Sequence, residues 1–151
     1  MMKINKYIIL ALLLTTGCTS MKFWIPSYSF DEVIAIKAQI DAAENPAKGF
    51  LLLKQLERKR VTVNNAIVKQ ISNSINIDYT FSVIATVEHS SGPIDCYIYT
   101  RNWRNEEDFT SVARLKSGDT IYVIGRFSRF LKLPGNKYAV ELVESNISKL
   151  K

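Results

Sequence analysis

The feature that most constrains this 151-residue chain is a run of alternating apolar and polar residues between Val61 and Ile147. Side chains on a β-strand point alternately to its two faces, so this period predicts half-buried strands. The run divides into five such segments, at residues 60–71, 76–88, 94–101, 120–131 and 137–147. Turn-forming residues fill three of the gaps: Ser72-Asn73-Ser74, Ser90-Ser91-Gly92-Pro93 and Pro134-Gly135. We therefore expect a mainly β domain.

Each segment is expected to bury its apolar face. The apolar positions of the second, third and fifth segments are Tyr79, Phe81, Val83, Ala85 and Val87; Ile94, Cys96 and Ile98; and Tyr138, Val140 and Leu142. Two interruptions predict irregular geometry. Asn64-Asn65 breaks the first segment and predicts a bulge or bend. Gly125 breaks the fourth segment, as glycine does where a barrel strand bends.

The period changes to that of a helix between the third and fourth segments. Asn105 is a suitable N-cap, and the three acidic residues after it suit the positive end of a helix dipole. Phe109, Val112 and Ala113 form an apolar stripe at helical spacing. Gly118 follows where left-handed backbone ends many helices. A short helix is therefore predicted here.

Five strands with a helix between the third and the fourth are the element order of the OB fold, a five-stranded Greek-key barrel. We expect an OB-fold domain over residues 60–151. The intervening helix should close one open end of the barrel, because its apolar stripe needs a surface on which to pack.

The amino-terminal residues predict an export signal. A basic stretch, Met1 to Lys6, precedes an apolar stretch, Tyr7 to Leu14, in the order that a signal peptide uses. The apolar stretch is shorter than the ~20 residues that a transmembrane helix needs. A signal peptide over residues 1–17 is therefore expected, with a short uncleaved anchor as an alternative.

The sequence Leu14-Thr15-Thr16-Gly17-Cys18 resembles a bacterial lipobox, although Thr15 stands where leucine is usual. The resemblance implies that Cys18 is lipidated and becomes the new N-terminus. Because Thr19 rather than aspartate follows, it also implies anchoring in the outer membrane of a Gram-negative cell envelope, with the domain facing the periplasm. An ordinary signal peptide is the alternative.

A tether, residues 18–28, and a helical hairpin, residues 29–59, are expected before the barrel. Ser29 and Glu32 fit a capping box at the start of a helix from about 30 to 44. Asn45-Pro46 fits the start of a second helix, from about 46 to 58. The apolar stripe of the second helix comprises Phe50, Leu53 and Leu56, widened by Leu51 and Leu52. Packing on the barrel wall is the favoured interpretation, and docking of a partner protein is the alternative.

Net charge, the single histidine and the absence of known catalytic motifs disfavour several classes of function. Removing Lys3 and Lys6 with the signal peptide lowers the net charge from +6 to +4, which does not require a nucleic-acid partner. A single histidine, His89, cannot form a two-histidine zinc site. No phosphate-binding glycine loop or nucleophile elbow occurs. We therefore expect no catalytic residue, no metal and no cofactor, and we expect Cys96 to be a small buried hydrophobe rather than a redox thiol.

The strongest candidate for ligand binding is a set of aromatic and basic residues on the third strand, in the loop after it and along the end of the fourth strand. OB barrels bind ligands on the second and third strands, where rings can stack on bases or sugars and arginines can pair with phosphate. The alternative is that the two tyrosines lie under the helical hairpin and the arginines are solvated. The candidate residues are Tyr97, Tyr99, Arg101, Trp103, Arg104, Arg126, Arg129 and Lys132.

Four stretches, RVTVNNAIVKQI, IDCYIYT, LKSGDTIYVIGRFS and YAVELVESNI, resemble the tRNA_anti-like family of small bacterial OB-fold proteins, many of them lipoproteins. The resemblance covers about residues 60–147 and implies the fold rather than an activity. Members often carry a second cysteine in the last strand, where this chain has Ser145, so a barrel disulfide with Cys96 is not expected. The function predicted is that of a non-catalytic envelope lipoprotein with a protein partner, and the alternative is a module that binds single-stranded nucleic acid.

Overall fold

The structure is a computed structural model that describes residues 27–74, 77–100 and 106–151. The predicted signal peptide, Cys18 and most of the tether lie outside the described residues, as does the expected N-cap Asn105. Among the residues described, no helix is long and apolar enough to cross a membrane.

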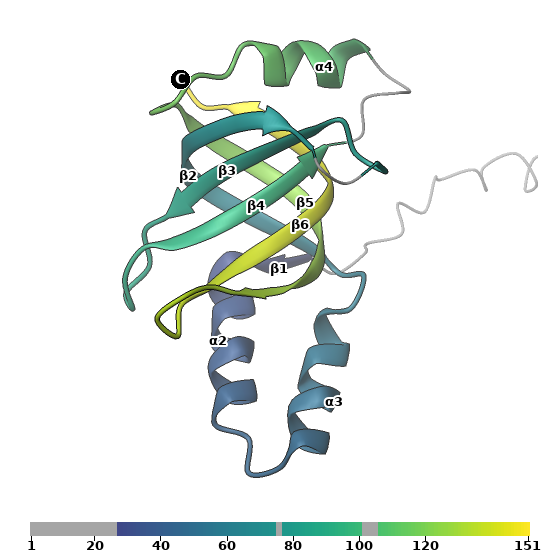
Figure 1. The fold of residues 1–151 in the computed structure, drawn as a ribbon, viewed down its shortest axis with the longest axis vertical. Coiled ribbons are helices and arrows are strands. Elements are labelled where there is room, and N and C mark those ends of the chain that lie inside the picture. Colours follow the sequence, from purple (N-terminus) through teal and green to yellow (C-terminus); the bar gives the residue numbers. More distant parts are fainter. Residues whose placement is uncertain (1–26, 75–76, 101–105) are drawn as a thin grey trace, which may run out of the picture.

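Five strands form a closed barrel (Figure 1). They are β2 (Arg60–Asn73), β3 (Phe81–Val87), β4 (Ile94–Thr100), β5 (Thr120–Lys132) and β6 (Tyr138–Lys149). The strand order is β2-β3-β4-β6-β5, and pairing of β5 with β2 closes the cylinder. Only the β4–β6 pair among these five strands is parallel. With α4 (Glu106–Ala113) between β4 and β5, this order confirms the predicted OB fold.

The inward faces of the strands fill the barrel with aliphatic side chains. Val63, Val83, Ile98, Ile121 and Leu142 are each fully buried. Burying surface of this kind contributes about 25 cal/mol per Å² of apolar area and is the main force that holds such a domain together. Burial alternates strictly in β4, as predicted, whereas in β3 and β6 residues expected on the outer face, such as Ser82 and Glu141, are buried as well.

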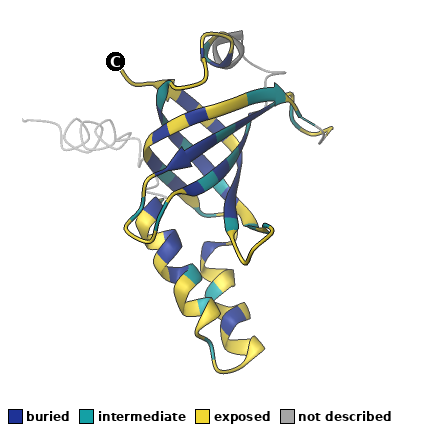
Figure 2. Ribbon diagram, turned by 60° about the vertical axis from the view of Figure 1, so that its left-hand side comes forward, coloured by how far each residue is buried: buried dark blue, intermediate teal, exposed yellow. Residues whose placement is uncertain are grey.

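Helices close both ends of this core. At one end, Val112 of α4 and Leu115 beyond it belong to the buried cluster, as predicted for the helix between the third and fourth strands. At the other end, Phe30 and Val33 of α2 (Phe30–Asp41) and Leu56 of α3 (Pro46–Leu56) join the same cluster. The hairpin of α2 and α3 thus packs at the end of the barrel and projects away from it, rather than covering the wall (Figures 1 and 2).

Both predicted irregularities are present. The β2–β5 register shifts between Val63 and Ala66, and Asn65 has a φ of 55°. The β5–β6 register shifts between Ile124 and Arg126, around Gly125. Such bulges let a strand bend enough to follow a closed barrel.

Three details of the barrel differ from expectation. The second strand begins at Phe81 rather than near residue 76, and Tyr79 precedes it instead of joining the core. The Tyr79 ring packs against Tyr99 on the outer face, with 5.5 Å between the ring centroids. Ala113, placed in the apolar stripe of α4, is exposed, because the helix ends there and Leu115 fills the space instead.

The caps of the hairpin are confirmed. The amide of Ser29 donates to Glu32 Oε2 at 2.7 Å, and the Glu32 amide donates to Ser29 Oγ at 3.3 Å. The Asn45 side chain accepts from the Lys48 amide at 2.9 Å. The sequence did not predict β1 (Ser27–Ser29), which pairs in parallel with the start of β2 and covers an edge that β3 does not reach.

Candidate functional site

The predicted tyrosine pair lies on the outer face of β4. Tyr97 and Tyr99 are both half-buried and alternate with the inward residues Cys96 and Ile98. We call this surface, formed by Tyr79, Ser82, Tyr97, Tyr99 and Glu141, the tyrosine face. Burial raises the pKa of Tyr99, and the nearby Glu141 carboxylate raises it further. The tyrosine hydroxyl is therefore a neutral hydrogen-bonding group at physiological pH.

A carboxylate lies in the middle of this face. Strand register places Glu141 of β6 opposite Tyr97 on one side and opposite Arg129 on the other. Ser128 Oγ donates to Glu141 Oε1 at 2.7 Å, and Arg129 Nη2 donates to Oε2 at 3.2 Å. Sequence alternation alone did not single out Glu141, although its position opposite the tyrosine follows from the OB strand order. The positive charge of Arg129 is thus balanced by the carboxylate of Glu141.

The other predicted basic residues do not gather on the tyrosine face. Arg126 pairs with Glu144, at 3.0 Å between Nη2 and Oε1. Lys132 is exposed at the end of β5, where it pairs in register with Tyr138. The predicted Arg101, Trp103 and Arg104 lie outside the described residues. The structure therefore brings together Tyr97, Tyr99 and Arg129, and separates Arg126 and Lys132 from them.

The hairpin does not supply the neighbours of Tyr99. Tyr79 comes from the segment before β3, Ser82 from β3, and Glu141 and Arg129 from the β5–β6 pair. The hairpin lies instead at the end of the barrel (Figure 1). The interpretation in which the tyrosines lie under the hairpin therefore finds no support among these contacts.

A second feature, which sequence analysis missed, is an open cleft of about 690 Å³ at the end of the barrel. We call it the end cleft. It lies between α2, the β3–β4 turn and the β5–β6 turn, three segments far apart in the sequence, so no local pattern could reveal it. Its apolar and charged lining residues include Ile34, Ala38, Asp41, Lys69, Asp95 and Tyr138.

The end cleft contains charges of both signs. Asp95 accepts from Lys69 Nζ at 2.7 Å and from Thr86 Oγ1 at 2.7 Å. Partial burial acts to raise the pKa of Asp95, but these hydrogen bonds and the charge of Lys69 outweigh it, so the pKa is lowered. Asp41 lies near Tyr138 and, with burial, raises the pKa of that phenol. The cleft is thus suited to a ligand that carries both charged and apolar groups.

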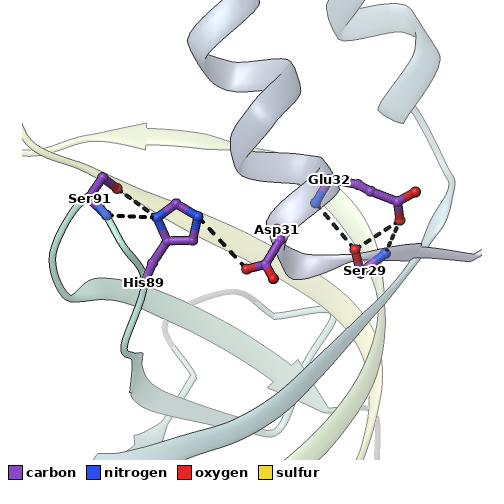
Figure 3. Close-up of polar contacts among 5 residues, drawn as sticks. All are labelled: Ser29, Asp31, Glu32, His89 and Ser91. Atoms are coloured by element: carbon purple, nitrogen blue, oxygen red, sulfur yellow. Dashed lines mark hydrogen bonds and ion pairs between the residues drawn. The ribbon is translucent and has the colours of Figure 1, made fainter.

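His89 lies on the wall of the end cleft, between a serine and an aspartate (Figure 3). Ser91 Oγ lies 2.7 Å from His89 Nδ1, and the Ser91 amide donates to the same nitrogen at 3.1 Å. His89 Nε2 lies 3.8 Å from Asp31 Oδ1 at the start of α2. The two contacts with Ser91 close the β3–β4 turn, and the ring lies near the Asp31 carboxylate at the start of α2.

Within residues 27–74, 77–100 and 106–151, no group of three or more histidine, cysteine, aspartate or glutamate side chains is arranged to hold a metal ion. Cys96 is fully buried in the barrel, as predicted. Burial raises the pKa of its thiol, and the charge of Asp95 adds to this effect. A thiol held in its protonated form is a poor nucleophile.

No protein-family model matches the chain, and no curated protein matches it in sequence. Solved structures similar to it include the mitochondrial single-stranded DNA binding protein Rim1 of S. cerevisiae, at 9% identity and a TM-score of 0.37, covering 61% of this chain and 92% of that one. Another is the OB domain of MM0293 from Methanosarcina mazei, at 14% identity and a TM-score of 0.33, covering 62% of this chain and 72% of that one.

Proposed function

We propose that this chain is a lipid-anchored protein of the bacterial cell envelope, held in the outer membrane through Cys18, whose OB-fold domain binds a protein partner in the periplasm without catalysis. The lipobox-like sequence that ends at Cys18 supports the anchor. The end cleft is the observation that carries the binding role, because its volume of about 690 Å³ lies in the range of ligand sites.

The end cleft favours a polypeptide ligand over a uniformly charged one. Lys69 and Lys137 line it together with Asp31, Asp41 and Asp95, so neither sign of charge dominates. Apolar wall residues such as Ile34 and Leu133 supply contact area between the charges. A polypeptide segment offers the same mixture of groups, whereas a phosphate chain would meet three carboxylates.

Crosslinking in intact cells tests this proposal. A photoreactive amino acid is introduced at Ala38, which lines the end cleft, and in a control at Ile77, which is 97% exposed outside it. We expect a discrete crosslinked envelope protein at position 38 and none at position 77. Lys137→Glu should weaken the crosslink. Recovery of monomer alone from every growth condition would contradict a protein-binding role.

The anchor is tested separately. In cells fed labelled palmitate, the parent protein should carry the label and fractionate with membranes, and Cys18→Ala should lose both properties. A Cys18→Ala protein that still fractionates with membranes would contradict lipid anchoring at this residue.

Binding of single-stranded nucleic acid is the second candidate function. The Tyr79–Tyr99 ring pair and Tyr97 favour it, because half-buried rings on the outer face of an OB barrel can stack on bases. The ion pairs that hold Arg126 and Arg129 disfavour it, since they use the charges that phosphates would need. Titration with a single-stranded oligonucleotide at low salt decides between the two functions, because phosphate contacts weaken steeply as salt rises.

A further inference from the structure

The outer side of α3 carries an apolar patch that neither the barrel nor α2 covers. Sequence analysis predicted that Phe50, Leu51 and Leu53 would be buried with Leu56, but they are 58%, 66% and 37% exposed. The helix instead faces α2 through Gly49, Leu52 and Leu56, at spacings of three and four residues. A Cβ atom on Gly49 would lie 3.7 Å from Ile40, an ordinary van der Waals distance, so this side of α3 lies against α2.

Basic side chains surround this patch. Residues 46–60, α3 and the turn into β2, contain Lys48, Lys54, Arg58, Lys59 and Arg60 and only one acidic residue, Glu57. Lys48, Lys54, Arg58 and Arg60 are exposed. Phe50 and Leu53 continue into a cavity of about 370 Å³ beside Phe127 and Ser128 of β5. Bulky apolar residues between lysines and arginines are typical of a helix that lies in the interface of an anionic membrane.

The start of the described chain lies beside this helix. Ser27 pairs in register with Arg60, four residues after the end of α3. Between Cys18 and Ser27 the chain can reach at most about 30 Å when fully extended. The 11 residues of α3 span only about 16 Å. Every residue of the patch is therefore within reach of a membrane that holds Cys18.

We propose that the outer face of α3, formed by Phe50, Leu51 and Leu53 with Lys48 and Lys54, lies on the surface of an anionic phospholipid bilayer. This inference rests on the proposed function, because the lipid anchor is what brings the helix to the membrane. The lipid anchor would hold the protein near the membrane, and contact through α3 would fix the orientation of the domain on the membrane. The hairpin projects from the end of the barrel (Figure 2), so α3 can contact a membrane while the barrel stays in the aqueous space.

A dye that reports its surroundings tests the contact in the acylated protein. Leu51→Cys and, as a matched control, Ile77→Cys are labelled with a dye that brightens in apolar surroundings, and the protein is reconstituted into vesicles. Both positions are highly exposed, at 66% and 97%, so neither change disturbs the core. Cys96 is buried and does not take the label under native conditions.

Vesicles that contain phosphatidylglycerol should brighten the dye at position 51, and vesicles of phosphatidylcholine should not. The dye at position 77 should respond to neither. Lys48→Gln and Lys54→Gln should each weaken the response by about fivefold, because each removes one positive charge and a basic residue near an anionic surface contributes about 1 kcal/mol. Equal signals from positions 51 and 77 on every vesicle would overturn the proposal.

Other occupants of the patch give different results. Brightening at position 51 in detergent that rises with protein concentration would show a second copy of the chain and overturn the membrane contact. Brightening that appears only when envelope proteins are added would show a protein partner and also overturn it. The palmitate label separates this inference from the proposed function. If the protein carries the palmitate label but the dye at position 51 does not respond, the lipid anchor is supported and the α3 contact is contradicted. If the protein carries no palmitate label, the lipid anchor itself is contradicted.

Discussion

Gly125 of β5 approaches Ser145 of β6 so closely that a Cβ atom on the glycine would lie 2.3 Å from Ser145 Oγ. The same atom would lie 3.0 Å from the Cβ of Leu142. The β5–β6 register shifts at this point, and Glu144 adopts a left-handed φ of 51°, so both strands bend here. The side chains of Ser145 and Leu142 thus fill the space beside Gly125 and leave no room for a Cβ atom at this bend.

Gly125→Ala should therefore destabilise the barrel. Overpacking of this kind lowers the free energy of unfolding by about 1–3 kcal/mol. Chemical denaturation with urea measures the change. In a Ser145→Gly background, which removes the 2.3 Å contact, the same substitution should cost less. An equal loss in both backgrounds would show that the contact with Ser145 is not the cause.

Ser145→Ala should leave stability unchanged or raise it. Ser145 Oγ is buried and, among the described residues, has no hydrogen-bond partner. An unpaired buried hydroxyl lowers stability by about 1–3 kcal/mol relative to an apolar group of the same shape. Thermal unfolding of the variant checks this. Ser82→Ala serves as a control, because the Ser82 hydroxyl has a partner in Tyr99, and that substitution should lower the melting temperature.

The sequence predicted the barrel well because strand alternation and turn chemistry are local signals. Asn64-Asn65 and the caps at Ser29 and Asn45 are found where their chemistry placed them. Gly118 has the predicted left-handed φ, 90°, but it lies in the turn before β5 rather than at the end of α4, which is Ala113. Local patterns could not say which side of α3 faces α2. Its apolar residues surround most of the helix, and the side that contains Gly49 is the one that lies against Ile40 and Ala43. The exposure of Phe50 and Leu51 is thus a result of tertiary packing.

The candidate site was predictable only in part. Alternation on β4 placed Tyr97 and Tyr99 on one face, but the charge on that face depends on Glu141 of a strand about 40 residues away in the sequence. The end cleft depends on three segments that meet only in the folded chain. The sequence alone does not show that Arg126 and Arg129 are in ion pairs, because their partners, Glu144 and Glu141, lie on the neighbouring strand.

Asp95→Asn should make stability less dependent on pH. Hydrogen bonds from Lys69 and Thr86 lower the pKa of Asp95 in the folded state, so its carboxylate favours folding. That contribution is fully present above the unfolded pKa of about 3.9 and is lost as pH falls through the lowered folded value. At neutral pH we expect a loss of about 0.5–1 kcal/mol on substitution. Urea denaturation from pH 7 to pH 2 should show the two proteins converging in acid, with exposed Glu44→Gln as the control.

Cys96 should resist alkylation in the folded protein. The thiol is fully buried, and burial raises its pKa, so the reactive thiolate is scarce. In a Cys18→Ser protein, iodoacetamide should label Cys96 only after unfolding in urea. Cys96→Ser should lower stability by about 1–3 kcal/mol, because it buries a hydroxyl among aliphatic neighbours, whereas Cys96→Ala loses only packing. Rapid labelling in the native state would contradict the structural role and indicate a redox thiol.

Combining Glu141→Gln with Glu144→Gln should create an affinity for single-stranded nucleic acid that the parent lacks. The two carboxylates hold Arg129 and Arg126 in ion pairs at 3.2 Å and 3.0 Å, and amides would release the charge of Arg129 beside the tyrosine face and that of Arg126 elsewhere on β5. We expect no binding by the parent at tens of micromolar in low salt. The double variant should bind with a log–log salt slope near −1.4, about −0.7 for each phosphate neutralised on a single strand. A parent that binds as tightly as the variant would show that the ion pairs do not block phosphate and would favour the nucleic-acid function over the protein-binding one.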